Sequence, residues 1–131
     1  MKPDELMERA KEAVSTAYAP YSGYRVGAAL LCADGTVVTG CNIENASFSL
    51  THCAERTALH AAVSSGRRQF RAIAIAASGE PAPFPCGACR QVLAEFCGPE
   101  LPVYIAAGDS YTTLTLGELL PHGFTFGAPH E

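Results

Sequence analysis

The chain has 131 residues, of which 48% are apolar and 17% are charged, and its formal net charge is −4. This length predicts a single domain over residues 1–131, and the composition excludes an intrinsically disordered protein. The longest basic run is the pair Arg67-Arg68, which argues against DNA or a long RNA as a partner. A small neutral substrate is compatible with this charge.

The N-terminal sequence MKPDELMERAKEA is charged and lacks the apolar core of a secretory signal peptide. No apolar run approaches the roughly 20 residues that span a bilayer. We therefore expect a cytoplasmic protein with no membrane partner, in which thiols stay reduced. The six cysteines are accordingly interpreted as metal ligands or redox groups, and not as a disulfide framework.

In chain order, the first predicted element is an amphipathic helix that begins at Pro3 and is ended by Pro20. The elements after it are a strand over 25–32, its hairpin partner over 36–41, a polar loop over 42–50, a helix over 54–66, a strand over 71–77, a helix over 88–96, and strands over 101–107 and 111–116. This order predicts an α/β fold, with three α/β/α layers around a mixed five-stranded sheet. The first two strands form a hairpin, and the later helices make parallel crossovers.

Two cysteine motifs lie where predicted helices begin. PCGACRQ, residues 85–91, holds Cys86 and Cys89, and residues three apart share a helix face, so both sulfurs can point at one ion. Cys53 precedes the other helix and offers a third thiol. Three thiolates without an obvious fourth protein ligand are typical of an open, reactive zinc site, since structural zinc sites are usually closed by four. We therefore predict that Cys53, Cys86 and Cys89 hold zinc.

The remaining candidate ligands are interpreted differently. His52 is not expected to bind the ion, because neighbouring helical residues diverge by about 100° and His52 and Cys53 would not face one point. The other three cysteines fall on predicted strands or helices and are interpreted as small buried hydrophobic residues; they are Cys32, Cys41 and Cys97.

Glu55 lies two residues after Cys53, where a carboxylate can take a proton from a metal-activated water and deliver it to a substrate atom. Zinc with three thiolates carries a net negative charge, which Arg56 and two helix N-termini can offset. Arg90 is a second candidate for that role. Taken singly, each residue has a simpler interpretation, as a solvated acid in the first turn or as an ordinary surface arginine.

Two other interpretations of the cysteines stay open at this point. CGAC, residues 86–89, resembles the Cys-Gly-x-Cys of thioredoxin-type oxidoreductases, whose motif follows the first parallel strand. Here it follows two predicted helices and three predicted strands, and a redox role leaves Glu55 unexplained. A non-catalytic structural zinc module would need a fourth protein ligand and also gives Glu55 no task.

The two motifs together, CAERTAL from Cys53 and PCGACRQVL from Pro85, resemble the paired signature of the small zinc-dependent cytidine deaminases. AYAPYSGYRVGAAL, TGCNIENASF and ELLPHGF resemble further segments of that family. The resemblance implies a cytidine deaminase-like fold with one zinc per chain. It also implies hydrolytic deamination of cytidine and deoxycytidine to uridine and deoxyuridine with release of ammonia, in pyrimidine salvage. A deaminase of a modified cytosine nucleoside, of the blasticidin type, is the alternative.

The same resemblance assigns roles within one subunit. Glu55 protonates the ring nitrogen of cytosine and then helps the amino group to leave. Asn42 and Glu44 match positions that hold the ribose hydroxyls. Tyr24 matches an aromatic position, usually Phe, that lies against the nucleoside, and the backbone of Ala54 meets the polar edge of the pyrimidine.

The family is typically a homotetramer whose active sites borrow residues from neighbouring subunits. The resemblance implies this assembly here, with Ala46, Phe48 and Phe124 contributed by neighbours. Phe48 stands where the family usually has Tyr, so the hydrogen bond of that hydroxyl is absent. Phe126 lies two residues beyond Phe124 and is a competing candidate for the aromatic residue of the C-terminal segment.

Overall fold

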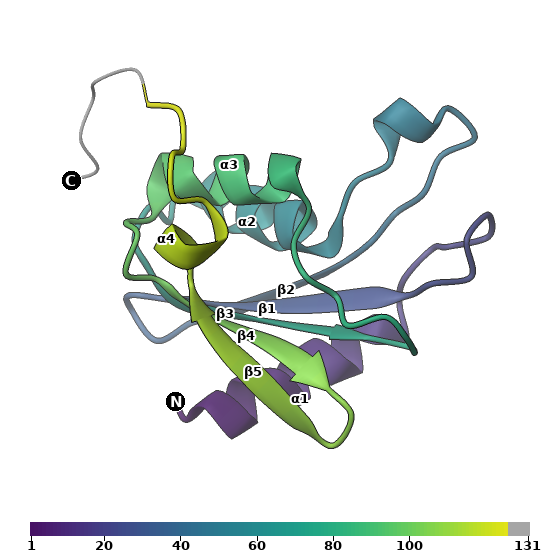
Figure 1. The fold of residues 1–131 in the computed structure, drawn as a ribbon, viewed down its shortest axis with the longest axis horizontal. Helices are drawn as coiled ribbons and strands as arrows, with labels where there is room; N and C mark the ends of the chain where they lie inside the picture. The colour runs from purple at the N-terminus through teal and green to yellow at the C-terminus, as the bar shows by residue number, and fades with distance from the viewer. Residues whose placement is uncertain (126–131) are drawn as a thin grey trace.

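The computed structural model describes residues 1–125, and the elements occur in the predicted order (Figure 1). They are α1 (Pro3–Val14), β1 (Val26–Cys32), β2 (Val37–Cys41), the 3₁₀ helix η1 (Phe48–Leu50), α2 (Ala54–Ser64), β3 (Phe70–Ala77), α3 (Gly87–Phe96), β4 (Pro102–Ala107), β5 (Ser110–Thr115) and α4 (Leu116–Leu119). Every predicted strand is therefore present. The short helices η1 and α4 are additions to the prediction.

Helix α1 ends at Val14 and does not run on to Pro20 as predicted. The hydroxyls of Ser15 and Thr16 donate back to carbonyls of the last turn, at 2.9 Å each. Beyond them the chain leaves the helix, because Tyr18 pairs through its backbone with the segment 42–44: its N–H donates at 3.0 Å and its carbonyl accepts at 2.9 Å. A tertiary pairing thus replaces the last helical turns that the apolar spacing favoured.

Helix α4 is explained by a short sequence motif at its start. Thr115 is its N-cap: the threonine hydroxyl accepts from the N–H of Glu118 at 3.2 Å, and the glutamate accepts from the N–H of Thr115 at 2.8 Å. This reciprocal pair is a capping box, which a Thr-x-x-Glu spacing encodes. The helix turns the chain away from the sheet after β5.

The sheet is mixed, with strand order β2-β1-β3-β4-β5. β1 runs antiparallel to both of its neighbours, β4 and β5 form a second antiparallel pair, and β3 and β4 are parallel, with Ile75 opposite Ile105. The crossover through α3 therefore joins adjacent parallel strands, as predicted. The crossover through α2 joins β2 to β3 in the same direction, but β1 lies between them.

Two apolar clusters hold three layers together (Figure 1). On one face of the sheet, α2, α3 and α4 cover Leu30, Ile73 and Ile105, which are fully buried. On the other face, α1 packs Leu6 and Met7 against the sheet. Both faces of the central strands are thus removed from water, which is the main source of the fold's stability. The predicted α/β/α arrangement is confirmed.

Glycines on two strands let the helices approach the sheet closely. A Cβ atom on Gly40 of β2 would lie 2.5 Å from the backbone nitrogen of Ala58 and 2.8 Å from the carbonyl oxygen of Ala54. A Cβ on Gly27 of β1 would lie 2.2 Å from the carbonyl oxygen of Ala10 in α1. Only glycine fits at these contacts, so Gly40 sets how near the start of α2 lies to the sheet.

All six cysteines are free thiols. Cys32 and Cys97 are buried in the larger cluster, as predicted, whereas Cys41 is only half-buried because β2 is an edge strand. Within residues 1–125, none of the helices has the length and apolar character needed to cross a bilayer.

Candidate metal centre and substrate cavity

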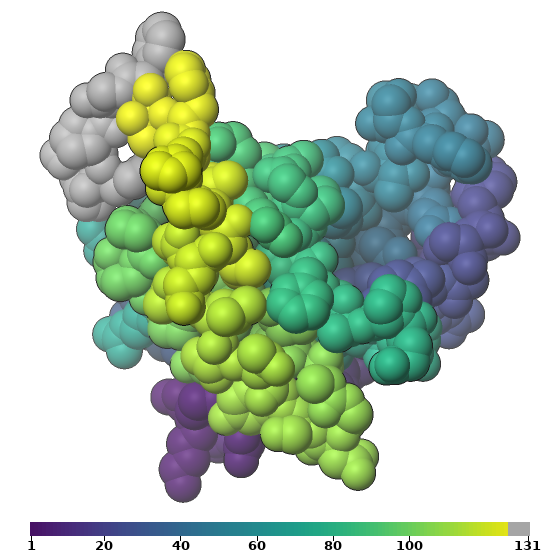
Figure 2. All heavy atoms as spheres, viewed as in Figure 1, coloured from purple at the N-terminus to yellow at the C-terminus, as the bar shows by residue number. Residues whose placement is uncertain are grey.

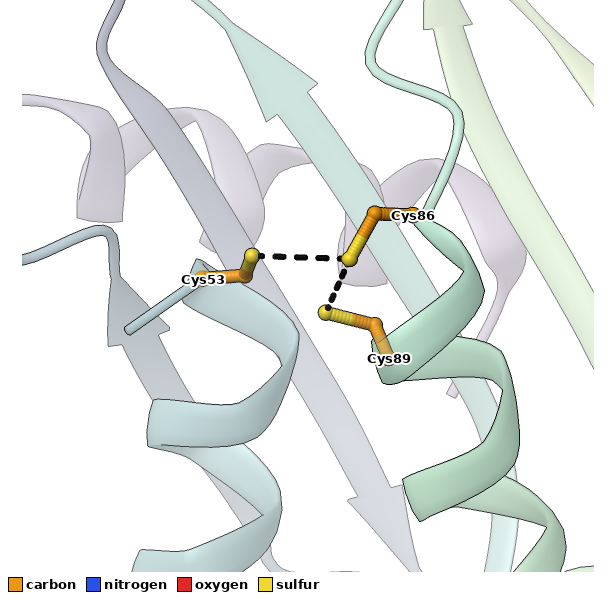
Figure 3. Close-up of side chains that lie close together, drawn as sticks. All are labelled: Cys53, Cys86 and Cys89. Atoms are coloured by element: carbon orange, nitrogen blue, oxygen red, sulfur yellow. Dashed lines mark hydrogen bonds between the residues drawn. The ribbon is translucent and has the colours of Figure 1, made fainter. Parts of the chain in front are cut away.

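Helices α2 and α3 begin side by side, and the cysteines lie at these two N-termini (Figure 3). Cys53 is the N-cap of α2, Cys86 is the N-cap of α3, and Cys89 lies in the first turn of α3. The Sγ atoms of Cys53 and Cys86 are 3.8 Å apart, those of Cys86 and Cys89 are 3.4 Å apart, and all three lie within 4.8 Å of one another. The predicted trio is therefore assembled.

This spacing fits zinc. A tetrahedral zinc ion with Zn–S distances of about 2.3 Å requires sulfurs about 3.8 Å apart, close to what the trio provides. Among the described residues, no His, Asp or Glu joins the three thiols as a fourth member of the cluster. A zinc ion held here keeps one position for a water or a substrate, which is the arrangement of a reactive site and not of a structural one.

The local electrostatics favour a thiolate at Cys53. Contact with the thiol of Cys89 and a hydrogen bond from Arg56 lower the pKa of Cys53 to about 5, against the opposing effect of burial. Interaction with the Cys53 thiolate and burial raise the pKa of Cys89. Arg56 Nη2 lies 3.4 Å from the Sγ atom of Cys53 and 3.3 Å from the carbonyl oxygen of Thr51. The guanidinium is thus held against the sulfur whose charge it was predicted to offset.

Glu55 lies in the first turn of α2 and is 5% exposed. Burial raises its pKa to about 7, and the negative Cys53 adds to the effect. A carboxyl group in this state is divided between its two protonation forms near neutral pH, which suits a group that both accepts and donates a proton. Its side chain lines a cavity together with Cys53 and Cys86.

The cavity above the cysteines has a volume of about 260 Å³. The residues predicted to contact substrate within one subunit all line it: Tyr24, Asn42, Glu44 and Ala54. The prediction missed other lining residues, of which Pro83 and Phe84 form the wall next to Cys86. Phe84 is a large apolar residue that is 50% exposed, and its place in the Pro-rich loop directly before Cys86 is a signal that would have identified it.

Asn42 and Glu44 also hold the cavity wall together. The Oδ1 atom of Asn42 accepts from the N–H of Val26 at 2.9 Å, and its Nδ2 donates to the carbonyl of Tyr24 at 2.8 Å. Glu44 accepts from the backbone N–H groups of residues 21 and 22 at 2.9 and 3.1 Å, and from the hydroxyl of residue 22. An amide offers two donors and two lone pairs, and a carboxylate about four acceptor sites. Asn42 therefore keeps one donor and one lone pair, and Glu44 keeps one acceptor site.

The hydroxyl of Tyr24 donates to the backbone carbonyl of Pro81, in the loop that leads to Cys86. Burial, the nearby Glu80 and then Glu55 raise the pKa of Tyr24, so the group stays a neutral donor. The hydroxyl that distinguishes this residue from Phe therefore orients the ring along the cavity wall and ties two loops of the site together.

The residues assigned to neighbouring subunits do not line this cavity. Ala46 is exposed, Phe48 is 73% exposed and Phe124 is 70% exposed. Phe48 lines an adjoining hollow of about 420 Å³ with Tyr21, whose ring it meets edge-on at 6.0 Å. The segment around η1 stands out from the body of the molecule (Figure 2). Phe126 lies outside the described residues.

Two further residues lie away from the sulfurs. Arg90 donates to the carbonyls of Pro85 and Leu119, at 2.7 and 2.8 Å, so its guanidinium contacts backbone oxygens and no thiol. The ring of His52 lies against His60, with centroids 5.8 Å apart, and does not join the cysteine trio.

This chain matches a family model, and it is similar to curated relatives and to solved structures. The model of the cytidine and deoxycytidylate deaminase zinc-binding region matches residues 1–105. The cytidine deaminase of Sporosarcina psychrophila is 51% identical over 127 residues, covering 95% of this chain and 93% of that protein. The crystal structure of cytidine deaminase from Burkholderia pseudomallei has a TM-score of 0.90 and 46% identity, over 95% of this chain and 100% of that one.

A more distant relative is the blasticidin-S deaminase of Bacillus cereus, which is 30% identical over 133 residues, covering 92% of this chain and 91% of that protein. The chain is therefore more similar to the cytidine deaminase of Sporosarcina psychrophila than to this blasticidin-S deaminase. The solved structure also confirms the predicted fold class, including the mixed five-stranded sheet.

Proposed function

Because this chain belongs to the cytidine and deoxycytidylate deaminase family, we propose that it removes the amino group from cytidine and deoxycytidine by hydrolysis. The products are uridine or deoxyuridine and ammonia, and the chain acts as one catalytic domain. The observation that carries the proposal is the pairing of a zinc-fitting thiol trio with the buried Glu55 on the wall of a single cavity.

Zinc held by Cys53, Cys86 and Cys89 would act as a Lewis acid that lowers the pKa of water towards neutrality. Glu55 performs the proton transfers. Its carboxylate accepts a proton as the oxygen of water attacks the amine-bearing carbon, and it delivers that proton to the neighbouring ring nitrogen. A second transfer through Glu55 goes to the amino group, which leaves as ammonia while the ring carbonyl forms. One water is consumed for each ammonia released.

Arg56 keeps this chemistry possible by opposing the charge of the sulfurs. Three thiolates around a divalent ion leave a net negative charge, which resists ionisation of a water molecule. The guanidinium at 3.4 Å from the Cys53 sulfur and the N-termini of α2 and α3 reduce that charge. We assign Arg56, and not Arg90, to this role, since Arg90 contacts only carbonyl oxygens among its hydrogen-bond partners.

The nucleoside lies in the cavity with its base towards Glu55 and its sugar towards the loop 42–44. The remaining hydrogen-bonding capacity of Asn42 and Glu44 suits the hydroxyls of a ribose. The ring of Tyr24 forms an apolar wall, and the backbone of Ala54 at the start of α2 meets the polar edge of the base. This placement is supported by the fact that all four residues line one cavity.

We further propose a homotetramer in which Ala46, Phe48 and Phe124 complete the cavities of neighbouring subunits. The exposure of both aromatic side chains supports this, since large exposed apolar groups commonly mark contact surfaces. Mixing inactive Glu55→Gln subunits with Phe124→Ala subunits tests this assembly. If sites are shared, some active sites in the mixture combine an intact Glu55 with an intact Phe124 and should show a normal KM. A monomer by light scattering, or a mixture with no such cavities, would contradict the assembly.

The activity is tested by measuring zinc per chain and following ultraviolet absorbance with cytidine, deoxycytidine, cytosine and blasticidin S. We expect turnover of the two nucleosides only. Failure of zinc-loaded protein to convert cytidine would sink the proposal, and turnover of blasticidin S alone would establish the alternative. Cys53→Ala should lose zinc and activity, whereas Cys41→Ala, at a half-buried position, should keep both.

The six free thiols fit a reducing compartment, and we propose that the protein is cytoplasmic.

A further inference from the structure

Two side chains of the second cysteine motif take no part in the chemistry above and yet are half-buried: Arg90 and Gln91. They follow the ligand Cys89 on α3, and both reach across to the C-terminal segment that runs beside this helix (Figure 1). Their partners are backbone groups, so the contacts hold the path of the chain and do not depend on which side chains it carries.

Gln91 makes a reciprocal pair with Phe124. Its Nε2 donates to the carbonyl of Phe124 at 2.7 Å, and its Oε1 accepts from the N–H of Phe124 at 3.2 Å. A side-chain amide used in this way imitates the pairing of two strands, in which one residue's donor and acceptor are both satisfied. Two bonds to the same residue fix its rotation as well as its position, and the ring of Phe124 is left 70% exposed.

Arg90 holds the start of the same segment. Its Nε donates to the carbonyl of Pro85, next to Cys86, and its Nη1 donates to the carbonyl of Leu119, the last residue of α4. The planar guanidinium has its donors in a fixed fork, so it sets the separation between the metal loop and α4.

We propose that Gln91, assisted by Arg90, is a positioning residue for substrate binding: it orients Phe124 towards the cavity of a neighbouring subunit. The inference rests on the proposed function, since it concerns the same substrate. Helix α3, which carries Cys86 and Cys89, also holds Phe124 through Gln91. The metal centre of one subunit and a wall of the next cavity are therefore built on one rigid element.

The test is a double-mutant cycle on zinc-loaded protein, with KM and kcat for cytidine measured for Gln91→Met, Phe124→Ala and the double variant. Methionine keeps the size of Gln91 and removes both hydrogen bonds. If Phe124 stacks on the nucleoside, Phe124→Ala should raise KM by about 5–100-fold, and Gln91→Met by about 3–10-fold, with kcat nearly unchanged. The double variant should match Phe124→Ala alone, because the orientation of an absent ring cannot matter. Glu95→Ala, exposed on the same helix, is the matched control and should leave KM unchanged.

Additive effects of the two substitutions on KM, or no effect of either, would overturn the proposal. Hydrogen exchange of the Phe124 amide gives a readout that does not depend on turnover, and it should speed up in Gln91→Met and not in Glu95→Ala. An unchanged exchange rate in Gln91→Met also overturns the proposal, because the two hydrogen bonds from Gln91 (the anchor of Phe124) would then not hold the segment. If the wild type fails to convert cytidine while exchange responds as expected, the proposed function fails and the anchor stands as a structural contact without a role in binding.

Discussion

Gly40→Ala is the perturbation that best tests how the fold positions the site. The added Cβ would lie 2.5 Å from the backbone nitrogen of Ala58, whereas unstrained contacts of carbon lie at about 3.5–4.0 Å. Backbone atoms cannot rotate away, so α2 must retreat from β2 by roughly 1 Å. Overpacking of this kind costs about 1–3 kcal/mol, which corresponds to a fall in melting temperature of about 4–12 °C.

The same shift reaches the chemistry, because Cys53 and Glu55 move with α2 while Cys86 and Cys89 stay with α3. A misplacement of about 1 Å in a catalytic group can cost about 10²-fold in rate, so kcat/KM should fall well beyond what stability explains, and zinc should bind more weakly. Calorimetry, zinc titration and cytidine turnover measure the three effects. Gly79→Ala is the matched control, since nothing lies within 4 Å of a Cβ there. A Gly40→Ala protein that behaves like the control would refute this account of how α2 is placed.

Replacing Glu55 by Gln keeps its size but removes its ability to carry a proton, so turnover should fall by about 10²–10⁴-fold while zinc per chain is unchanged; retained turnover would refute the proton role. Replacing Tyr24 by Phe removes the hydroxyl that donates to Pro81 and should lower the free energy of unfolding in urea by about 0.5–1.5 kcal/mol, with little change in KM because the ring stays. A large KM change at unaltered stability would contradict this. Hydrogen bonds from Ser22 lower the pKa of Glu44 from its ordinary 4.5, so the stability it contributes is complete above pH 4.5 and is lost as the pH falls through the lowered pKa. The difference in melting temperature between wild type and Glu44→Gln should therefore shrink below pH 4.5, and a constant difference would count against the reasoning.

Much of the fold can be predicted from the sequence because its signals are local. Each strand is a β-rich run bounded by Gly, Pro or Asp, and its observed ends differ from the predicted ones by at most one residue. The early end of α1 could not be predicted, because it depends on the pairing of Tyr18 with residues 42–44, which are distant in sequence. The position of β1 between β2 and β3 depends likewise on long-range pairing.

In the site, too, local features could be predicted and long-range contacts could not. The pair Cys86 and Cys89 follows from local spacing within one helical turn. Cys53 lies 33 positions before Cys86, and its membership of the trio was predicted from its place at another helix start and from the paired motifs. The bonds of Asn42 to the chain at residues 24 and 26 and of Arg90 to Leu119 could not be predicted, because the partners are 16 to 29 positions away. Charge alone suggested Arg90 as a counter-ion for the sulfurs, but the carbonyls that only the folded chain brings within reach hold it elsewhere.

Cys53 and Cys86 each stand directly before a helix, and 33 positions of chain separate them. An ion bound by both is therefore a reversible crosslink that closes a loop containing α2 and β3. Such a crosslink favours the folded chain by the free energy with which the ion binds, since the unfolded chain offers no assembled site. The ion that serves the chemistry would therefore also stabilise the fold, and removing it should lower the free energy of unfolding.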